Sequence, residues 1–313
     1  MQPGLDDGDR TTVAGSEGAS LRRVLACTDF SEASNAAVLA AAAICRRSGA
    51  RLCVLHVDAQ AAASGALTKA RGHSARRKAK LEEKLAAAVN VARELGAEVS
   101  GALISGDSRS TILQAIEDRE IDLAVVGTRG TRGLQRLLFG STAETVFRSA
   151  RCPILTVGPI AVDVAKNAKD GPIVFATDFH EPAVEAAHWA ARLANLYDAE
   201  LHCIHVLPQS VEAEVENTMV ISVMTKALRE LTHDGSECER QPVFKVIFGG
   251  KVCEAVVDYS RRQHARAIVL GARRKVPFAA HLPPQIEYKV IEAASCPVVT
   301  VSFDGSADEA ELE

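Results

Sequence analysis

The residues best suited to chemistry form a glycine-rich segment near the middle of the chain. It reads Gly127-Thr-Arg-Gly130-Thr-Arg-Gly133 and, six residues later, ends in Gly140-Ser141. Glycine lets the backbone approach a ligand closely and adopt positive φ, so that N–H groups can face phosphate oxygens. The segment follows an apolar run and precedes a helix expected over 142–148, and the first N–H groups of a helix also attract anions. The spacing therefore favours a phosphate-binding loop.

Two common phosphate motifs are excluded here, and a purely structural explanation stays open. No P-loop of the form G-x-x-x-x-G-K-[ST] occurs, and the spacing of the glycines differs from the Rossmann G-x-G-x-x-G. Ser141 and Glu144 also fit a capping box, S-x-x-E, in which the serine serves only its own helix. The glycines alone therefore do not decide between a ligand loop and a turn.

Short apolar runs alternate with amphipathic stretches, and these elements would position the loop. In the N-terminal half the runs are near-continuous in Val, Leu and Ile, as in strands that are buried on both faces: 24–28, 52–57, 99–104, 123–127 and 154–157. Helices are expected over 33–47, 78–95 and 111–119, the second ending at Gly96. This alternation predicts an open parallel sheet with helices on both faces, which binds ligands at the carboxyl ends of its strands.

The chain repeats this pattern. Residues 24–57 align with 173–206 without a gap, and 11 of the 34 pairs are identical, including Thr-Asp-Phe and His-Val. Residues 127–157 align with 271–301, and 9 of the 31 pairs are identical, including Cys-Pro. Strands of the second copy are expected over 173–177, 201–207, 243–248, 267–271 and 298–301.

The repeat predicts an α/β fold of two tandem, open, doubly wound domains, each with a five-stranded parallel sheet flanked by helices. Residues 21–158 would form the first domain, 159–171 a linker and 172–303 the second domain. Residues 1–20 are expected to form a disordered tail, and 304–313 an acidic tail.

Together these features resemble the universal stress protein family in its tandem two-domain form. The nucleotide-binding members of that family carry G-x2-G-x9-G-[ST], which Gly127, Gly130, Gly140 and Ser141 match. The resemblance covers about residues 22–157 and 172–301. It implies a stress-response protein that binds ATP with Mg²⁺ in its N-terminal domain and acts as a nucleotide-dependent regulator, not as an efficient enzyme.

The resemblance also implies which residues contact the nucleotide. They are Thr28, Asp29, Val57, Val126, Gly127, Arg129, Gly130, Gly140, Ser141 and Thr142. Asp29 would approach the adenine and ribose, and Val57 would present its backbone to the adenine edge. The phosphates would lie at Gly130 and the residues 140–142, with Arg129, Arg132 and Arg136 adding positive charge. Asp29 also fits a plain acidic residue at the start of a helix.

The second copy departs from the motif. Gly271 is retained, but Arg274 stands where the first copy has Gly130, and Pro284-Gln285 stands where it has Gly140-Ser141. Proline has no N–H to donate and fixes φ near −65°. We therefore expect the second domain to be structural or to carry interactions, without binding ATP in the family manner.

Composition narrows the function classes. A formal net charge of −4 and 4% aromatic residues argue against nucleic-acid binding as the main task. The eight cysteines include no C-x-x-C pair, which argues against a zinc ribbon or a thioredoxin-type pair. The first 20 residues lack the apolar core of a signal peptide, and no apolar run is long enough to span a membrane. We expect a soluble, cytoplasmic protein.

Three further patterns lead to weaker expectations. The run His202-Cys203-Ile204-His205 suggests metal ligands, but neighbours on a strand point to opposite faces, so we expect a role in the core. Basic residues within 69–80 and acidic residues within 212–216 are typical of solvated helix faces, or could instead meet across domains or across a dimer. The apolar last strands predict pairing between domain edges, either within one chain or in a homodimer.

Two alternative functions stay open: a slow ATPase, and a nucleotide-independent interaction or lipid-binding module. Co-purification of an adenine nucleotide would separate the nucleotide-binding functions from the last alternative.

Overall fold

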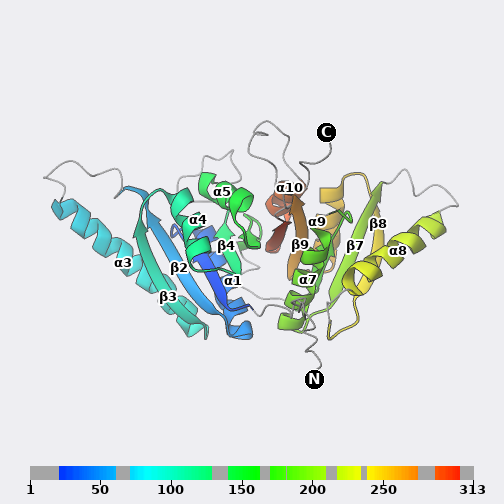
Figure 1. Cartoon of the computed structure of the whole chain (residues 1–313), viewed down its shortest axis with the longest axis horizontal. Helices are drawn as coiled ribbons and strands as arrows, with labels where there is room; N and C mark the ends of the chain where they lie inside the picture. The colour runs from blue at the N-terminus through cyan, green and yellow to red at the C-terminus, as the bar shows by residue number, and fades with distance from the viewer. Residues whose placement is uncertain are drawn as a thin grey trace, which may run out of the picture.

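The computed structural model describes residues 21–60, 71–128, 140–162, 170–180, 182–208, 217–233, 238–273 and 286–303 (Figure 1). The strands are β1 (Arg23–Cys27), β2 (Arg51–Asp58), β3 (Glu98–Ser105), β4 (Leu123–Gly127), β5 (Ile154–Val157), β6 (Ile173–Ala176), β7 (Leu201–Pro208), β8 (Val243–Gly249), β9 (Ala267–Arg273) and β10 (Val298–Phe303). The helices are α1 (Glu32–Ser48), α3 (Arg71–Glu94), α4 (Ser108–Asp118), α5 (Ser141–Ser149), α7 (Ala183–Tyr197), α8 (Asn217–His233), α9 (Val252–Arg262) and α10 (Ile286–Ala293).

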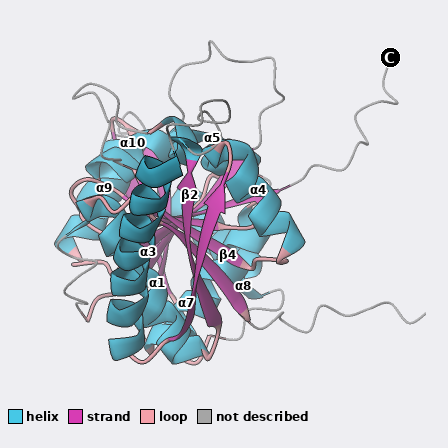
Figure 2. Cartoon of the chain, turned by 90° about the vertical axis from the view of Figure 1, so that its left-hand side faces the viewer, coloured by secondary structure: helices cyan, strands magenta, loops and turns pink. Residues whose placement is uncertain are grey.

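All ten strands form one sheet, in the order β3-β2-β1-β4-β5-β10-β9-β6-β7-β8. Neighbouring strands are parallel except β5 and β10, which run antiparallel with Val299 opposite Leu155. Each half of the chain therefore contributes five parallel strands, and helices lie on both faces of the sheet (Figure 2). The predicted fold class is confirmed, and the predicted edge pairing occurs within one chain.

The expected domain limits stay a prediction. The tails 1–20 and 304–313 and the central part of the linker, 163–169, lie outside the described residues.

Helix α1 shows how the sequence positions the strand ends. Its first turn is capped by Ser31, whose hydroxyl accepts a hydrogen bond from the N–H of Ser34. Its last turn ends at Gly49, which adopts the left-handed region at φ 72°. Its buried face consists mainly of alanines, among them Ala36, Ala37 and Ala41. Small side chains let this helix lie close to β1 and β4, so its N-terminus reaches the end of β4.

Helix α3 is longer than its hydrophobic pattern indicates. It begins at residue 71 instead of 78, because the segment 71–80 carries no apolar stripe, and residues 74–80 are mostly exposed. Its end agrees with the prediction, since Gly96 lies just beyond it at φ 89°. None of the described helices is both long and apolar enough to cross a lipid bilayer.

Side chains reinforce the junction between the two halves. Arg148 on α5 donates from Nε to the hydroxyl of Tyr288 on α10, at 3.1 Å. The rings of Phe147 and Tyr288 lie 4.8 Å apart. The last turn of α5 is therefore tied directly to the C-terminal half.

The histidine run on β7 has the expected role in the core. His202 is 5% exposed, and its ring nitrogens lie 3.2 Å from a Glu200 carboxylate oxygen and 3.0 Å from the Tyr259 hydroxyl. His205 contacts the carbonyl oxygen of Thr177. Within the described ranges no group of three or more His, Cys, Asp or Glu could hold a metal ion. The acidic residues of 212–216 lie outside those ranges, so the proposed charge pairing stays a prediction.

Candidate functional site

The carboxyl ends of β1 and β4 meet at the point where the strand order of the N-terminal half reverses. The chain passes from β1 to β2 and β3 on one side and returns to β4 on the other. Ala26 on β1 lies opposite Val125 on β4, so Thr28, directly after β1, and Gly127, at the end of β4, lie at the ends of neighbouring strands. Open α/β sheets bind ligands in the crevice outside such a switch point.

A tight turn follows β1 and holds Thr28 and Asp29 in fixed positions. The hydroxyl of Thr28 accepts a hydrogen bond from the N–H of Phe30 at 3.0 Å, and the carboxylate of Asp29 accepts one from the N–H of Ser31 at 3.0 Å. Phe30 adopts a left-handed backbone at φ 65°, which costs a non-glycine residue roughly 1–2 kcal/mol. This strain is held in place by the surrounding contacts, a feature that clusters at functional sites.

His56 on β2 contacts this turn through both a ring nitrogen and the face of its ring. Its Nδ1 lies 2.7 Å from the carbonyl oxygen of Thr28, and its ring lies 4.4 Å from the ring of Phe30. Sequence reasoning noted Thr-Asp-Phe and His-Val only as marks of the repeat and missed this contact. The signal was available, because both copies share both motifs.

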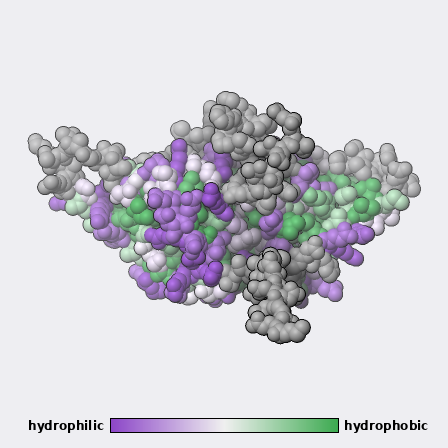
Figure 3. Space-filling view, viewed as in Figure 1, coloured by the Kyte–Doolittle hydropathy of each residue, from purple (hydrophilic) through white to green (hydrophobic). Residues whose placement is uncertain are grey.

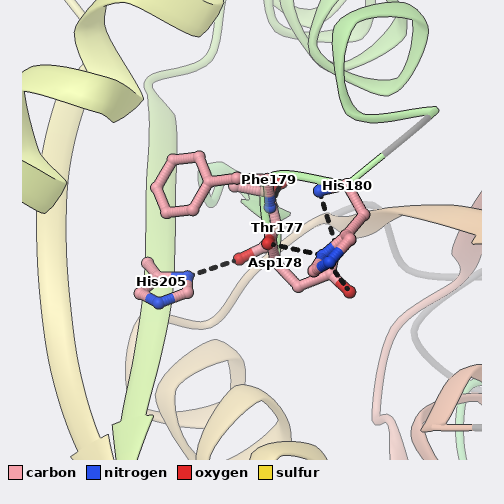
Figure 4. Close-up of polar contacts among 5 residues, drawn as sticks. All are labelled: Thr177, Asp178, Phe179, His180 and His205. Atoms are coloured by element: carbon pink, nitrogen blue, oxygen red, sulfur yellow. Dashed lines mark hydrogen bonds and ion pairs between the residues drawn. The ribbon is translucent and has the colours of Figure 1, made fainter.

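The C-terminal half contains the same turn (Figure 4). Phe179 has φ 63°, and its ring lies 4.7 Å from that of His205. His205 Nδ1 lies 2.8 Å from the carbonyl oxygen of Thr177. In one position the halves differ: His180 replaces Ser31, and its ring lies 3.4 Å from the carboxylate of Asp178. The turn itself is therefore common to both halves.

Gly127 is required by the fold. A Cβ atom at this position would lie 2.6 Å from the carbonyl carbon of Ala33 and 2.7 Å from the nitrogen of Ser34. Both are backbone atoms at the start of α1, so no side-chain rotation relieves the clash. The close packing of α1 on β4 thus accounts for this glycine without a ligand.

Gly140 differs from Gly127 in its described surroundings. It is the N-cap of α5 at φ −65° and ψ 144°, and among the described residues a Cβ atom would meet only the carbonyl oxygen of Thr128, at 3.8 Å. Its N–H donates to that same oxygen at 2.9 Å, which any residue except proline could do. Because the N-cap residue is a glycine, it has no side chain with which to cap the first turn of α5.

The alternative explanation of Ser141 and Glu144 as a capping box is not supported, because the N-cap residue is Gly140. Ser141 is the first residue inside the helix and Gly140 is the cap, so the helix begins one residue earlier than the 142–148 expected. The carboxylate of Glu144 pairs with Arg148 at 3.1 Å and does not reach back to the cap. Within the described residues, the N-cap residue of this helix therefore supplies no side-chain acceptor to the first N–H groups, and such groups at a helix start favour an anion.

The structure places eight of the ten predicted contact residues near the carboxyl ends of β1, β2 and β4 or at the start of α5. Thr28 and Asp29 follow β1, Val126 and Gly127 end β4, and Gly140, Ser141 and Thr142 begin α5. Val57 lies on β2, one strand away, opposite Ile104. Arg129 and Gly130, together with Arg132 and Arg136, lie outside the described residues.

The nearest thiol is not a nucleophile. Burial raises the pKa of Cys27 at the end of β1 to about 12, with Cys53 and Cys152 adding to the shift. Cys27 is therefore protonated at neutral pH. The described part of the site offers hydrogen-bonding groups, a carboxylate and a helix N-terminus, which are features of a binding site.

Both halves of the chain match the same family. Residues 20–158 and residues 171–302 each match the sequence model of the universal stress protein family. The chain belongs to this family. Two matches, one in each half, also confirm the tandem organisation.

Individual universal stress proteins resemble parts or all of the chain. It is 37% identical over 76 residues to universal stress protein MJ0531 of Methanocaldococcus jannaschii, a match that covers 24% of this chain and 45% of that protein. A universal stress protein structure from Archaeoglobus fulgidus DSM 4304 covers 90% of this chain and 98% of its own, with 20% identity and a TM-score of 0.66. A universal stress protein solved in complex with cAMP covers 45% of this chain and 98% of its own, with 23% identity and a TM-score of 0.36.

Proposed function

We propose that the N-terminal half of this universal stress protein binds an adenine nucleotide, ATP with Mg²⁺, and that occupancy regulates the protein. The C-terminal half has a structural or interaction role in this proposal. The adenine and ribose lie against the turn at Thr28 and Asp29, and the phosphates lie at the first turn of α5.

The observation that carries the proposal is a glycine at the N-cap of α5. Among the described residues, a Cβ atom would clash with backbone at Gly127 but would have room at Gly140. A ligand that approaches the backbone would account for a glycine at this helix start, where the N-cap residue offers no side-chain cap. The switch point between β1 and β4 places that helix start beside the strand ends.

The sequence of the C-terminal half supports restricting the site to the N-terminal half. Both halves share the turn after the first strand, so both could contact an adenine and ribose. Pro284 and Gln285 stand where the N-terminal half has Gly140 and Ser141. Proline lacks the N–H that the proposed phosphate contact uses.

Mg²⁺ would be held mainly by the phosphates. Glu144 is the carboxylate in the first turn of α5, and it pairs with Arg148 in the part of the chain that the structure describes. Mg²⁺ commonly retains several waters and binds through phosphates with one or two protein ligands. Ser141 and Thr142 would supply hydroxyl groups at this end of the helix.

Helix α5 gives the proposed regulation a physical route. Its first turn carries the phosphate contact, and its last turn contacts Tyr288 in the other half through Arg148. A nucleotide that binds one arrangement of α5 more tightly than another would shift the population of domain arrangements.

A matched pair of variants tests the nucleotide site. In Asp29→Ala and Asp178→Ala the turn loses a hydrogen bond to the carboxylate, from the N–H of Ser31 at 3.0 Å or of His180 at 3.1 Å. Asp178→Ala also removes the contact with the His180 ring at 3.4 Å, so urea unfolding of both variants accompanies the binding measurement. We expect ATP·Mg²⁺ to bind one site per chain and its Kd to rise about tenfold or more in Asp29→Ala, with no change in Asp178→Ala.

Isothermal titration calorimetry with ATP, AMP and cAMP, with and without Mg²⁺, provides the measurement. An equal rise of the Kd in both variants would mean that the two halves share the binding. The absence of binding heat with all of these nucleotides would refute nucleotide binding.

A further inference from the structure

The first two strands of the N-terminal half separate at the carboxyl edge of the sheet. Cys27 and Leu55 are the last paired residues of β1 and β2, and the N–H of Thr28 then donates to the carbonyl oxygen of Leu55 at 2.9 Å. β2 continues to Asp58, whereas the chain after Thr28 turns away into α1. On that side, the last three residues of β2 therefore lie beside the turn at residues 28–31 and not beside a paired strand.

The main chain of Val57 faces this turn. Along a strand, the N–H and C=O groups of successive residues face opposite neighbours, so residues two apart face the same one. Leu55 presents its carbonyl oxygen to β1, and Val57 presents its N–H and C=O in the same direction. These are the groups that the proposed nucleotide site assigns to the adenine edge.

His56 connects the turn with this end of β2. Its Nδ1 lies 2.7 Å from the carbonyl oxygen of Thr28. A carbonyl oxygen can only accept, so Nδ1 carries a proton and donates it. The imidazole ring also lies 4.4 Å from the ring of Phe30. Because Val57 is the next residue in the chain, these contacts set how far the turn lies from its main chain.

The other hydrogen bonds described for this turn act within it. The Thr28 hydroxyl accepts from the N–H of Phe30, and the Asp29 carboxylate accepts from the N–H of Ser31. These bonds shape the turn, but they do not fix its distance from β2. Phe30 is also in the left-handed region at φ 65°, a conformation that persists only where surrounding contacts hold it.

The C-terminal half repeats the arrangement and supplies an internal control (Figure 4). His205 Nδ1 lies 2.8 Å from the carbonyl oxygen of Thr177, and its ring lies 4.7 Å from that of Phe179. Substitution of His205 therefore removes the same two contacts as substitution of His56. It does so in the half to which no nucleotide is assigned.

We propose that His56 is a positioning residue for the nucleotide. It fixes the distance between the main chain of Val57 and the turn that carries Asp29, and it thereby sets the affinity for the base and ribose. The inference rests on the proposed nucleotide site. His56 acts through the turn, and the phosphate contacts at the start of α5 do not depend on it.

His56→Ala tests this role with two ligands that share a base and ribose. We expect the Kd values of AMP and of ATP to rise by the same factor, about tenfold, because the variant removes one hydrogen bond and one ring contact from the turn. A disturbance that reached α5 would weaken ATP more than AMP. Isothermal titration calorimetry gives both constants.

Two further substitutions separate the hydrogen bond from the ring contact. His56→Asn places an amide N–H where the imidazole has Nδ1, and His56→Phe keeps a ring beside Phe30 but cannot donate. We expect the asparagine to restore the affinity to within about threefold of wild type and the phenylalanine to bind as weakly as the alanine. The reverse order would assign His56 to packing alone and overturn the proposal.

His205→Ala is the matched control, and it should leave the Kd values of AMP and ATP unchanged. The two halves differ in their surfaces: Figure 3 shows hydrophobic surface at the right-hand end of the molecule, where Figure 1 places β8 and α8. Sedimentation velocity therefore verifies that all variants have the oligomeric state of the wild type, and circular dichroism verifies that they remain folded.

Amide hydrogen exchange of the ligand-free protein tests the contact itself. In His56→Ala we expect exchange at the N–H groups of Phe30 and Ser31 to accelerate about tenfold or more, and His56→Asn should reverse this. The N–H of Leu25, in the middle of β1, should exchange as in the wild type. Unchanged exchange at the turn overturns the proposal whatever the nucleotide affinities are.

The wild-type titration separates failure of this inference from failure of the proposed function. A wild-type chain that binds neither AMP nor ATP refutes the nucleotide site, and this inference with it. A wild-type chain that binds both, with unchanged Kd values in His56→Ala, overturns the inference alone.

Discussion

Gly127→Ala will destabilise the N-terminal half by about 3 kcal/mol or more. The new Cβ would lie 2.6 Å from the carbonyl carbon of Ala33 and 2.7 Å from the nitrogen of Ser34. Relief requires α1 to move away from β4, and the alanine face of that helix packs directly on the sheet. Because the turn after β1 leads into α1, the same movement would also disturb Thr28 and Asp29.

Urea and thermal unfolding followed by circular dichroism measure this loss, which corresponds to a drop of roughly 6–12 °C in Tm. Gly271→Ala is the control in the other half. There the added Cβ would lie 3.2 Å from Cδ of Pro182, a ring atom that can move by a few tenths of an ångström. We expect it to cost less than about 1 kcal/mol. Equal losses in the two variants would contradict the distinction drawn between the two helix contacts.

Gly140→Asp will change stability and nucleotide affinity in opposite directions. The backbone at Gly140 is extended, as an N-cap requires, and a side chain has room there. An aspartate would cap the first N–H groups of α5 and interact with the helix dipole, which stabilises the helix by about 1 kcal/mol. The same carboxylate would occupy the phosphate position and repel the phosphates, so we expect the Kd for ATP to rise about 100-fold or more.

Two further variants separate the causes. Gly140→Asn caps the helix without a charge and should weaken binding less than the aspartate does. Gly250→Asp adds a carboxylate to the other half, at a glycine whose Cβ would meet nothing within 4 Å, and should leave the affinity unchanged. Proline is a poorer choice at Gly140, because it would also remove the hydrogen bond to Thr128. A variant that is more stable and still binds ATP with wild-type affinity would refute the phosphate position.

The fold follows from patterns that are local in the sequence. β4 and β5 begin and end at the predicted residues because each is a continuous apolar run in the middle of the sheet. The strand ends near the solvent were predicted less well: β10 continues beyond the apolar run to Phe303, since its backbone pairs with Arg273 on β9. The start of α3 was missed for the related reason that its polar turns carry no hydrophobic period.

The site could be predicted only in part. The positions of Thr28, Gly127 and Gly140 follow from strand ends and a glycine motif. The contact between His56 and the turn could not be derived from local pattern, because it joins residues 28 positions apart in the chain through the pairing of β1 with β2.

Crystals grown with ATP and Mg²⁺ provide the most direct measurement of where the chain holds nucleotide. We predict density for one ATP per chain, with its phosphates at the N–H groups of residues 140–142 and its ribose near Asp29. The turn at Asp178 and the start of α10 should hold none. Nucleotide density in the C-terminal half, or an empty N-terminal half at saturating ATP, would contradict the account.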